Sequence, residues 1–235
     1  MSRTKMIFLG AGFFFLFAFQ TFAQAGTLDL IGSNAGQAEF KRFSKELGIA
    51  ISYLPVSPAE PLGIVGFDAG AEITTGSIKK VNGSKTTVVL PKLHLQKGLP
   101  FGFDIGAIYS KISALDIALV GGELKYAIIS GNVALPAVAV RAGYTQLTGV
   151  DELELSTLSA DLSISKGITF ITPYAGVGVV QVTSKEKAGL DLAEEKQSIT
   201  KGFVGVKFSF AVINFVAEAD FSDVPLYTLR VNVGL

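Results

Sequence analysis

The final ten residues of the chain, Leu226–Leu235, read L-Y-T-L-R-V-N-V-G-L. Successive side chains of a strand point to opposite faces of a sheet, so the alternation from Tyr227 onward predicts a strand with one apolar and one polar face. Alternation up to the last residue is unusual, because chain ends commonly fray. The pattern therefore predicts a terminal strand held in a sheet along its whole length. The apolar set is Tyr227, Leu229, Val231, Val233 and Leu235, and the polar set is Thr228, Arg230, Asn232 and Gly234.

This ending resembles the closing strand of bacterial outer-membrane β-barrels, whose last residues alternate and end on a hydrophobic residue recognised during assembly. Those proteins usually end on Phe or Trp, whereas this chain ends on Leu235. The resemblance implies two partners, outer-membrane lipid and the outer-membrane assembly machinery, which would bind the C-terminal strand. An amphipathic strand of a secreted β-sandwich is the alternative at this point.

The N-terminus predicts a secretory signal peptide over residues 1–25. Arg3 and Lys5 precede the uncharged run Met6–Phe19, and Ala23-Gln24-Ala25 forms a small-x-small cleavage site. The uncharged run is shorter than the about 20 residues of a membrane-spanning helix. We therefore expect an exported chain with three parts: the signal at 1–25, an N-terminal segment at 26–48, and a β-barrel at 49–235. The absence of cysteine excludes a disulfide framework.

The charge balance gives no reason to expect nucleic acid as a partner. Residues 26–235 carry 18 basic and 20 acidic side chains, and nucleic-acid binding relies on a basic surface. Downstream of the signal, no uncharged apolar run approaches the length of a spanning helix. The mature part is long enough for one large all-β domain.

One amphipathic helix is predicted, over Gln37–Leu47. Phe40, Phe43 and Leu47 recur at helical spacing, Asn34 is a candidate N-cap, and Gly48 is a candidate C-terminal stop. Such a helix would plug the barrel lumen, cap one end of it, or pack outside the rim.

The rest of the mature chain predicts strand after strand. Most candidates run 9 to 15 residues, longer than the about 5–6 residues usual in globular proteins and in the range of the about 9–11 residues that cross a bilayer at a tilt. Eleven are found, and since single-chain bacterial barrels have an even number, we expect 12 strands with Gly26–Gly32 as the twelfth, or 10 if Ile49–Pro55 stays outside. The candidates are Ile49–Pro55, Gly63–Ser77, Thr86–Gln96, Phe101–Ile112, Leu115–Ile129, Ala137–Leu147, Leu153–Ser165, Thr169–Thr183, Thr200–Phe210, Ile213–Phe221 and Leu226–Leu235.

The expected fold is thus an all-β, antiparallel, up-and-down transmembrane β-barrel of about 12 strands (10 to 12) with one short N-terminal helix. Uncharged apolar faces and aromatic residues near strand ends favour lipid outside and a polar interior. Long polar connections at 79–85, 148–152 and 184–198 alternate with short ones, in phase with a periplasmic C-terminus. In a soluble barrel, the faces Phe101/Phe103/Ile105 and Val204/Val206/Phe208 would instead line a cavity for an apolar ligand.

Charged residues on the inward faces carry both signs in similar number. Because unpaired charges inside a protein are costly, we expect a cross-barrel network of ion pairs that narrows the lumen. The candidate network consists of Asp68, Glu72, Asp104, Arg141, Lys207, Glu218, Asp220 and Arg230.

Catalytic, metal and cofactor sites are not expected. The single histidine, His94, has no Gly-x-Ser-x-Gly elbow around it, so a lumenal structural role is favoured over a membrane-embedded enzyme. With no Cys and one His, a metal site would need carboxylates, and Asp191, Glu194 and Glu195 lack the spacing of a calcium loop.

The stretches Leu62–Glu72 and Leu90–Gly106, with L-P-K-L and G-L-P-F-G-F-D-I-G, make the chain similar to an uncharacterised group of bacterial outer-membrane barrel proteins. These motifs report architecture and imply no reaction. The expected function is a non-enzymatic outer-membrane protein, either a narrow pore or transporter for small or hydrophobic solutes or a structural membrane protein. An enzyme using His94 and a soluble periplasmic barrel are the alternatives.

Overall fold

The computed structural model describes residues 36–79, 85–112 and 117–234 as one helix and ten strands. The predicted signal peptide, the segment Gly26–Gly32 and Asn34 lie outside the described residues. Within these ranges, no helix is long and apolar enough to cross a membrane. In chain order the elements are α3 (Gln37–Ile51), β1 (Phe67–Lys79), β2 (Lys85–Gly98), the short 3₁₀ turn η3 (Pro100–Gly102), β3 (Phe103–Ile112), β4 (Ile117–Ile129), β5 (Ala137–Thr148), β6 (Leu153–Ser165), β7 (Ile171–Glu186), β8 (Glu195–Phe210), β9 (Ile213–Phe221) and β10 (Leu226–Gly234).

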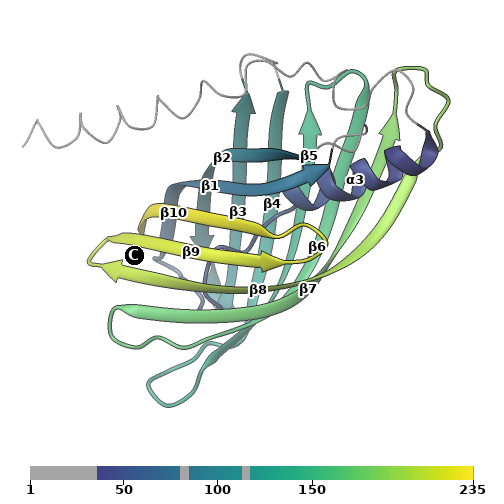
Figure 1. Cartoon of the computed structure of the whole chain (residues 1–235). Coiled ribbons are helices and arrows are strands. Elements are labelled where there is room, and N and C mark those ends of the chain that lie inside the picture. Colours follow the sequence, from purple (N-terminus) through teal and green to yellow (C-terminus); the bar gives the residue numbers. More distant parts are fainter. Residues whose placement is uncertain (1–35, 80–84, 113–116, 235) are drawn as a thin grey trace, which may run out of the picture.

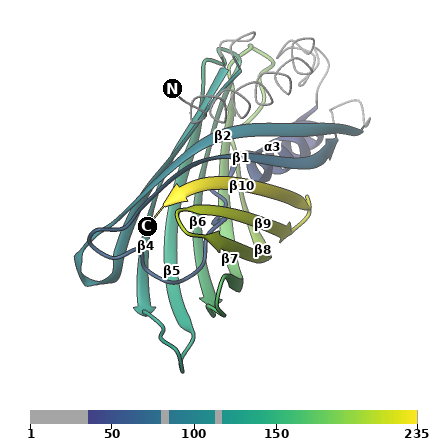
Figure 2. The ribbon, with the colours of Figure 1, turned by 90° about the vertical axis from the view of Figure 1, so that its left-hand side faces the viewer.

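The strands form a closed antiparallel barrel in which each strand pairs with its neighbours in sequence (Figure 1). The first strand closes the barrel by pairing with the last, and Figure 2 shows β1 and β10 side by side at this seam. Gly76 lies opposite Leu226 and Asp68 opposite Gly234, so the predicted terminal strand is paired from Leu226 to Gly234. Leu235 lies outside the described residues. Closure removes the exposed edges that an open sheet would present.

The expectation of 12 strands is wrong, because the barrel has ten. The predicted strand Ile49–Pro55 does not exist: Ile49–Ile51 form the last turn of α3, and an irregular segment follows up to β1. The barrel wall therefore begins at Phe67 and not at residue 49. The even number required by an up-and-down barrel is met without a strand from the N-terminal region.

The outside of the barrel is apolar, as the alternation predicted. Outward positions carry an apolar belt of exposed side chains, and inward positions carry buried charges and hydroxyls together with an apolar layer around α3. Phe101, Ile105 and Val204 are exposed on the outside, so the cavity expected of a soluble ligand-binding barrel is not formed by these faces. The belt includes Leu93, Leu95, Ile105, Leu124, Val140, Leu158, Leu162, Val177, Val204, Phe215, Leu229 and Val231.

The two ends of the barrel differ. Four short connections, 99–102, 130–136, 166–170 and 211–212, lie at the end where β10 finishes; we call this the turn end. The other end, which we call the loop end, carries the β5–β6, β7–β8 and β9–β10 connections at 149–152, 187–194 and 222–225. On the outside, the strands become polar toward the loop end. This polar collar includes Thr87, Lys111, Gln146, Glu154, Gln181, Lys185, Lys196 and Thr200.

The helix α3 lies inside the barrel near the loop end, with β1 and β2 in front of it in Figure 2. Phe40 and Phe43 are completely buried and pack with inward apolar residues of the wall, as their helical spacing suggested. The helix contacts β1, β5, β6, β7 and β8. Of the three positions considered from the sequence, the structure shows the helix in the lumen.

Gly48 does not stop the helix, which continues for one more turn to Ile51. A Cβ at Gly48 would collide with Val182 on β7. The glycine is therefore needed for close approach of the helix to the wall, while burial of Ile49 and Ile51 supports the additional turn. Ser52 ends the helix, and its hydroxyl donates to the carbonyl of Ile49 at 2.8 Å.

Candidate functional site: the barrel lumen

The lumen has two layers of different chemistry. The layer near the loop end is apolar and is filled by α3 together with inward residues such as Leu119, Leu155, Val180 and Ile199. The layer toward the turn end contains the inward charges, and we call it the charged belt. Segment 52–66, which we call the lumenal segment, leads from the end of α3 to the start of β1 through the charged belt.

A row of inward positions crosses six neighbouring strands, β3 to β8, at one level of the charged belt, and five of the six positions are charged. Asp104, Lys125, Arg141 and Asp161 are direct partners in the registers of β3–β4, β4–β5 and β5–β6. Gly178 follows on β7, and Lys201 lies opposite it on β8. Strand pairing alone thus places these positions in one continuous line around the lumen. Opposite residues of neighbouring strands have their side chains on the same face, so all of them point inward.

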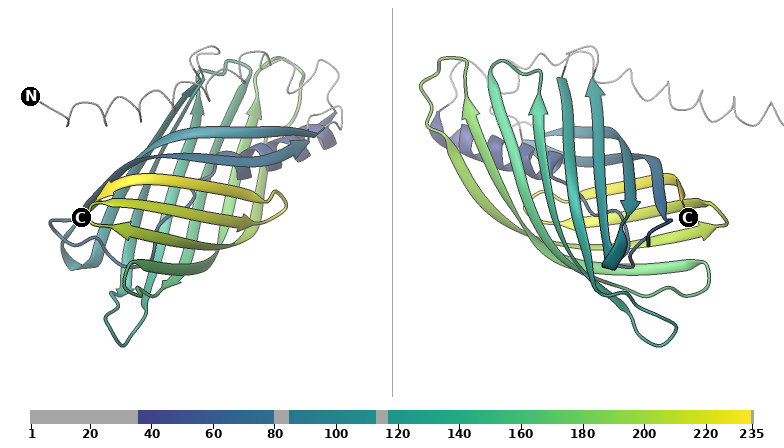
Figure 3. Two further views of the ribbon diagram at one scale, coloured as in Figure 1. Left: turned by 60° about the vertical axis from the view of Figure 1, so that its left-hand side comes forward. Right: turned by 180° about the vertical axis from the view of Figure 1, so that it is seen from behind.

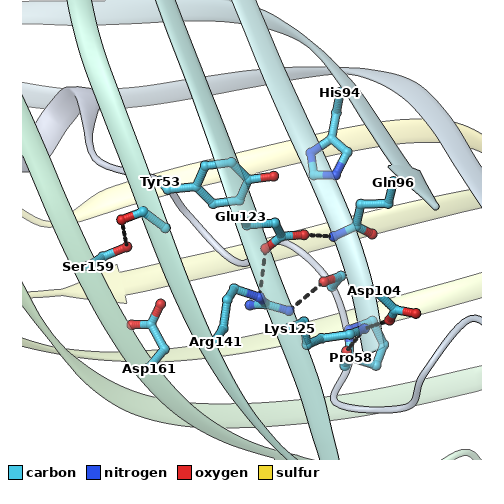
Figure 4. A network of polar contacts seen from close by, with 12 residues as sticks. Tyr53, Pro58, His94, Gln96, Asp104, Glu123, Lys125, Arg141, Ser159 and Asp161 are labelled. Carbon is cyan, nitrogen blue, oxygen red and sulfur yellow. Dashed lines mark hydrogen bonds and ion pairs between the residues drawn. The ribbon is translucent and has the colours of Figure 1, made fainter. Parts of the chain in front are cut away.

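Ion pairs in this row are short and buried (Figure 4). Lys125 Nζ lies 2.8 Å from Asp104 Oδ2, and Arg141 Nε lies 2.7 Å from Glu123 Oε2, with every one of these side chains at most 2% exposed. Gln96 also donates to Glu123. Further around the wall, Lys201 Nζ lies 3.3 Å from Asp161 Oδ1.

A second group surrounds His94 near the β1–β10 seam. Glu72 is opposite both Lys92 and Arg230 in the strand registers, and Lys92 Nζ lies 2.8 Å from Glu72 Oε1. Arg230 Nη1 donates to His94 Nδ1 at 3.0 Å. The same Nδ1 atom lies 3.5 Å from Glu72 Oε2, so His94 stands between the guanidinium and the carboxylate.

The third group contains more acid than base. Glu218 accepts a 2.8 Å hydrogen bond from the Tyr174 hydroxyl, and Asp220 lies 4.0 Å from Lys201, which is closer to Asp161. All of these carboxylates are buried. Lys201 is thus shared between two acids.

The charged belt holds the lumenal segment through that segment's backbone. Lys125 Nζ donates to the carbonyls of Glu60 at 2.9 Å and Pro58 at 3.4 Å, which together with Asp104 occupies its three donors. The amide of Leu62 donates to Asp104 Oδ1 at 3.1 Å. A buried irregular segment has polar groups that no helix or sheet satisfies, and wall side chains supply their partners.

Two more wall residues donate hydrogen bonds to the lumenal segment, and one side chain of the segment, Tyr53, packs closely against the inner side of the wall. Arg141 Nη2 donates to Ser57 Oγ at 2.8 Å, and Lys201 Nζ to the carbonyl of Tyr53 at 3.4 Å. Tyr53 lies close to two wall glycines: a Cβ at Gly106 would lie 2.9 Å from its hydroxyl, and a Cβ at Gly143 would lie 2.8 Å from its Cβ. Burial and the nearby Glu123 carboxylate raise the pKa of Tyr53 well above its usual value, so the hydroxyl stays protonated.

Polar contacts also fix the helix to the loop end. The hydroxyls of Ser44 and Ser184, on α3 and β7, are 2.9 Å apart and fully buried. Lys45 pairs with Asp223 at 2.5 Å, and Gln37 bonds to the carbonyl of Ala193 at 3.1 Å. The described chain therefore begins at the loop end and passes through the lumen to the turn end.

The structure places the eight candidate network residues inside or at the mouth of the lumen, but it pairs them mainly with residues outside that set. Asp68, Glu72, Asp104, Arg141, Glu218, Asp220 and Arg230 are buried. Lys207 is half-buried and lines a cavity of about 170 Å³ at the turn end together with Asp68. Asp68 accepts a hydrogen bond from Asn232.

Sequence reasoning missed most of the partners. They are Lys92, Glu123, Lys125, Asp161 and Lys201. Each is a charged residue at an inward position of its strand, opposite in face to the exposed apolar side chains, which is a usable signal, but the pairing depends on strand register.

No catalytic arrangement surrounds His94. It contacts Arg230, Glu72 and the ring of Tyr53, and no serine or cysteine nucleophile is paired with it in the described contacts. Among the described residues, no group of three or more His, Cys, Asp or Glu side chains is arranged to hold a metal ion.

No protein-family model matches the chain, and no curated protein sequence matches it. Solved structures similar to it include outer-membrane β-barrel proteins. One is the N-terminal β-barrel domain of Pseudomonas aeruginosa OprF, with 13% identity over 71% of this chain and 97% of that chain and a TM-score of 0.37. The KdgM porin has 10% identity over 72% and 98%, with a TM-score of 0.38. Ail of Yersinia pestis has 13% identity over 72% and 97%, with a TM-score of 0.31. The ten-stranded fold described above rests on the chain's own strand pairing.

Proposed function

We propose that this protein is a non-enzymatic outer-membrane β-barrel that acts as a narrow, gated pore for small solutes and is held shut by its own N-terminal region. The apolar belt supports membrane insertion, because a water-soluble protein would turn this face inward. The turn end, with the C-terminus, faces the periplasm in this proposal, and the loop end faces outward.

The single observation that supports gating is the occupation of the lumen by α3 and the lumenal segment. A ten-stranded barrel lies between eight-stranded barrels, which side chains fill, and 16-stranded porins, which hold water. Here α3 and the lumenal segment fill the interior. They are attached to the wall by side-chain contacts and not by strand pairing, so they can be displaced while the barrel stays closed.

Cysteine cross-linking tests the gate, because the natural chain has no cysteine. In the variant Ser44→Cys/Ser184→Cys, sulfur atoms replace hydroxyls that are 2.9 Å apart, close enough to form an S–S bond of about 2.05 Å with small adjustment. The full chain, purified from the outer-membrane fraction as a heat-modifiable band, is placed in planar bilayers. We expect channel openings in the reduced variant and their loss on oxidation, since the disulfide fixes α3 to β7.

The matched control is Thr145→Cys/Thr157→Cys, whose hydroxyls are 2.7 Å apart on β5 and β6. That disulfide joins two wall strands and leaves α3 free, so oxidation should not change conductance. Equal conductance of the oxidised and reduced Ser44→Cys/Ser184→Cys variants would reject the gate. Absence of openings in every reduced form would instead favour a structural role for a permanently filled barrel.

A further inference from the structure

The short connections at the turn end present apolar side chains to the outside. Phe101 in the β2–β3 turn is 91% exposed, Val133 in the β4–β5 turn is 100% exposed, and Ile168 in the β6–β7 turn is 60% exposed. Val65, where the lumenal segment leaves the barrel, is 84% exposed. Figure 3 shows the β4–β5 connection projecting beyond its neighbours.

The connections at the loop end have the opposite character. They carry Asp151 and Glu152 before β6, Asp191 and Glu194 between β7 and β8, and Asp223 before β10. The four turn-end connections contain no acidic residue, and their one lysine is Lys166. The described connections of the two ends overlap in length, so the ends differ mainly in the polarity of their connections.

Much of the backbone of the β4–β5 turn is paired within the protein. Lys166 Nζ donates to the carbonyls of Asn132 at 2.8 Å, Val133 at 2.7 Å and Leu135 at 3.2 Å. Asn132 Oδ1 accepts from the amides of Ala134 and Leu135, both at 2.8 Å. Turns in water need no such partners, whereas in an apolar medium every backbone polar group must be paired internally.

A second lysine repeats this arrangement on the other side of the barrel. Lys97 occupies the last outward position of β2, one residue before the strand ends. Lys166 occupies a comparable place, because it directly follows β6 and comes two residues after the outward residue Ile164. Its Nζ donates to the carbonyls of Ile64 and Gly66, the latter at 3.0 Å. Both cations at this rim are thus directed to backbone carbonyls of neighbouring connections.

On β6, the apolar belt alone is shorter than the apolar band of an outer-membrane barrel. On β6 it runs from Leu158 to Ile164, six steps, or about 20 Å along the strand at about 3.3 Å per residue. At a tilt of about 40°, this leaves about 15 Å along the membrane normal, against the about 25 Å of an outer-membrane apolar band. Continuation to Ile168 adds up to about 10 Å in the same geometry.

We propose that the turn end of the barrel is immersed in the adjacent membrane leaflet, with Phe101, Val133 and Ile168 inserted among the lipid chains. The partner of this surface is a lipid bilayer, because the rim is continuous with the apolar belt and three carbonyls of its β4–β5 turn are already paired with Lys166. The proposal rests on the proposed function, since it requires the belt to face lipid.

Site-directed labelling tests the immersion. Single cysteines are introduced into the full chain at Val133, Ile168, Leu162 and Ala188, labelled with an environment-sensitive fluorophore, and reconstituted in phosphatidylcholine vesicles with or without brominated acyl chains. Leu162 lies in the apolar belt and Ala188 is exposed in the β7–β8 loop. We expect the labels at Val133 and Ile168 to lose fluorescence about as strongly as the label at Leu162, and the label at Ala188 to be unaffected.

Quenching at Leu162 without quenching at Val133 and Ile168 would overturn the immersion and leave the membrane barrel standing. Absence of quenching at Leu162 would reject the membrane barrel itself. If the turn-end labels are unquenched in vesicles but cysteines at the same sites are protected from a polar thiol reagent in isolated outer membranes, the rim binds a protein and the lipid proposal fails.

Discussion

At the scale of single residues, the lumen depends on buried lysines that join two parts of the chain. Lys125 contacts a wall carboxylate and two carbonyls of the lumenal segment at once. Burying a charge is costly unless it is paired and hydrogen-bonded, and here the irregular backbone supplies part of that pairing. The same contacts that neutralise the wall therefore hold the lumenal segment in place.

Replacing Lys125 with Met should lower the free energy of unfolding by about 3–5 kcal/mol, because Asp104 remains as a buried, uncompensated charge. The matched control is Lys187→Met at the loop end. Lys187 pairs with Glu154, but both side chains are about half exposed, and such a pair is screened by water and contributes little to stability. Urea unfolding in detergent, followed by far-ultraviolet circular dichroism, measures both. Equal effects of the two substitutions would contradict the pairing of Lys125 described here.

A partial rescue separates lost charge pairing from lost packing. In Lys125→Met/Asp104→Asn the buried negative charge is removed, while the asparagine oxygen can still accept from the Leu62 amide. We expect this double variant to be more stable than Lys125→Met alone.

At the scale of elements, Gly48 determines how closely α3 approaches the wall. Ala is favoured over Gly inside a helix by about 1 kcal/mol, so Gly48→Ala would stabilise the protein if the residue were an ordinary helical position. Because the added methyl group would collide with Val182, we expect destabilisation instead, by about 1–3 kcal/mol. The same unfolding measurement gives the sign, and Gly48→Ala/Val182→Ala should recover stability. A stabilised Gly48→Ala variant would show that the helix is not in tight contact with β7.

The elements differ in how far the sequence predicted them. The helix was found because Phe40 and Phe43 follow its period, but its end was misplaced because glycine commonly stops helices and here serves close packing. Ile49–Pro55 was misread as a strand, since a buried irregular run is as apolar as a strand. The connection after Phe210 had no turn residue to mark it, and in the structure Ala211 makes it with a φ of 54°.

At the scale of the whole molecule, polarity was predictable and pairing was not. Alternation specifies which residues of one strand share a face, so it identified Asp104 and Arg141 as lumenal. It cannot specify which strand positions lie opposite each other, and register brings Lys125 between them. Alternation also gave no sign that the lumenal segment would accept hydrogen bonds from these charged side chains, because that segment has no periodicity.

Because the barrel is apolar on its outside, the cost of placing an Arg on its outer face should depend on the position of the residue along the strand. Val177 and Gln181 both point outward on β7, the first in the apolar belt and the second in the polar collar. In water, replacing either exposed residue with Arg would have little effect. In a bilayer, Arg at the middle of the belt costs about 2–4 kcal/mol and near the interface about 0–1 kcal/mol. We therefore expect Val177→Arg to destabilise the barrel in phospholipid vesicles strongly and Gln181→Arg weakly, as measured by reversible urea unfolding. The difference should shrink in detergent, where head groups can rearrange around the charge. Equal and small effects in vesicles would mean that the outer face of this barrel meets water.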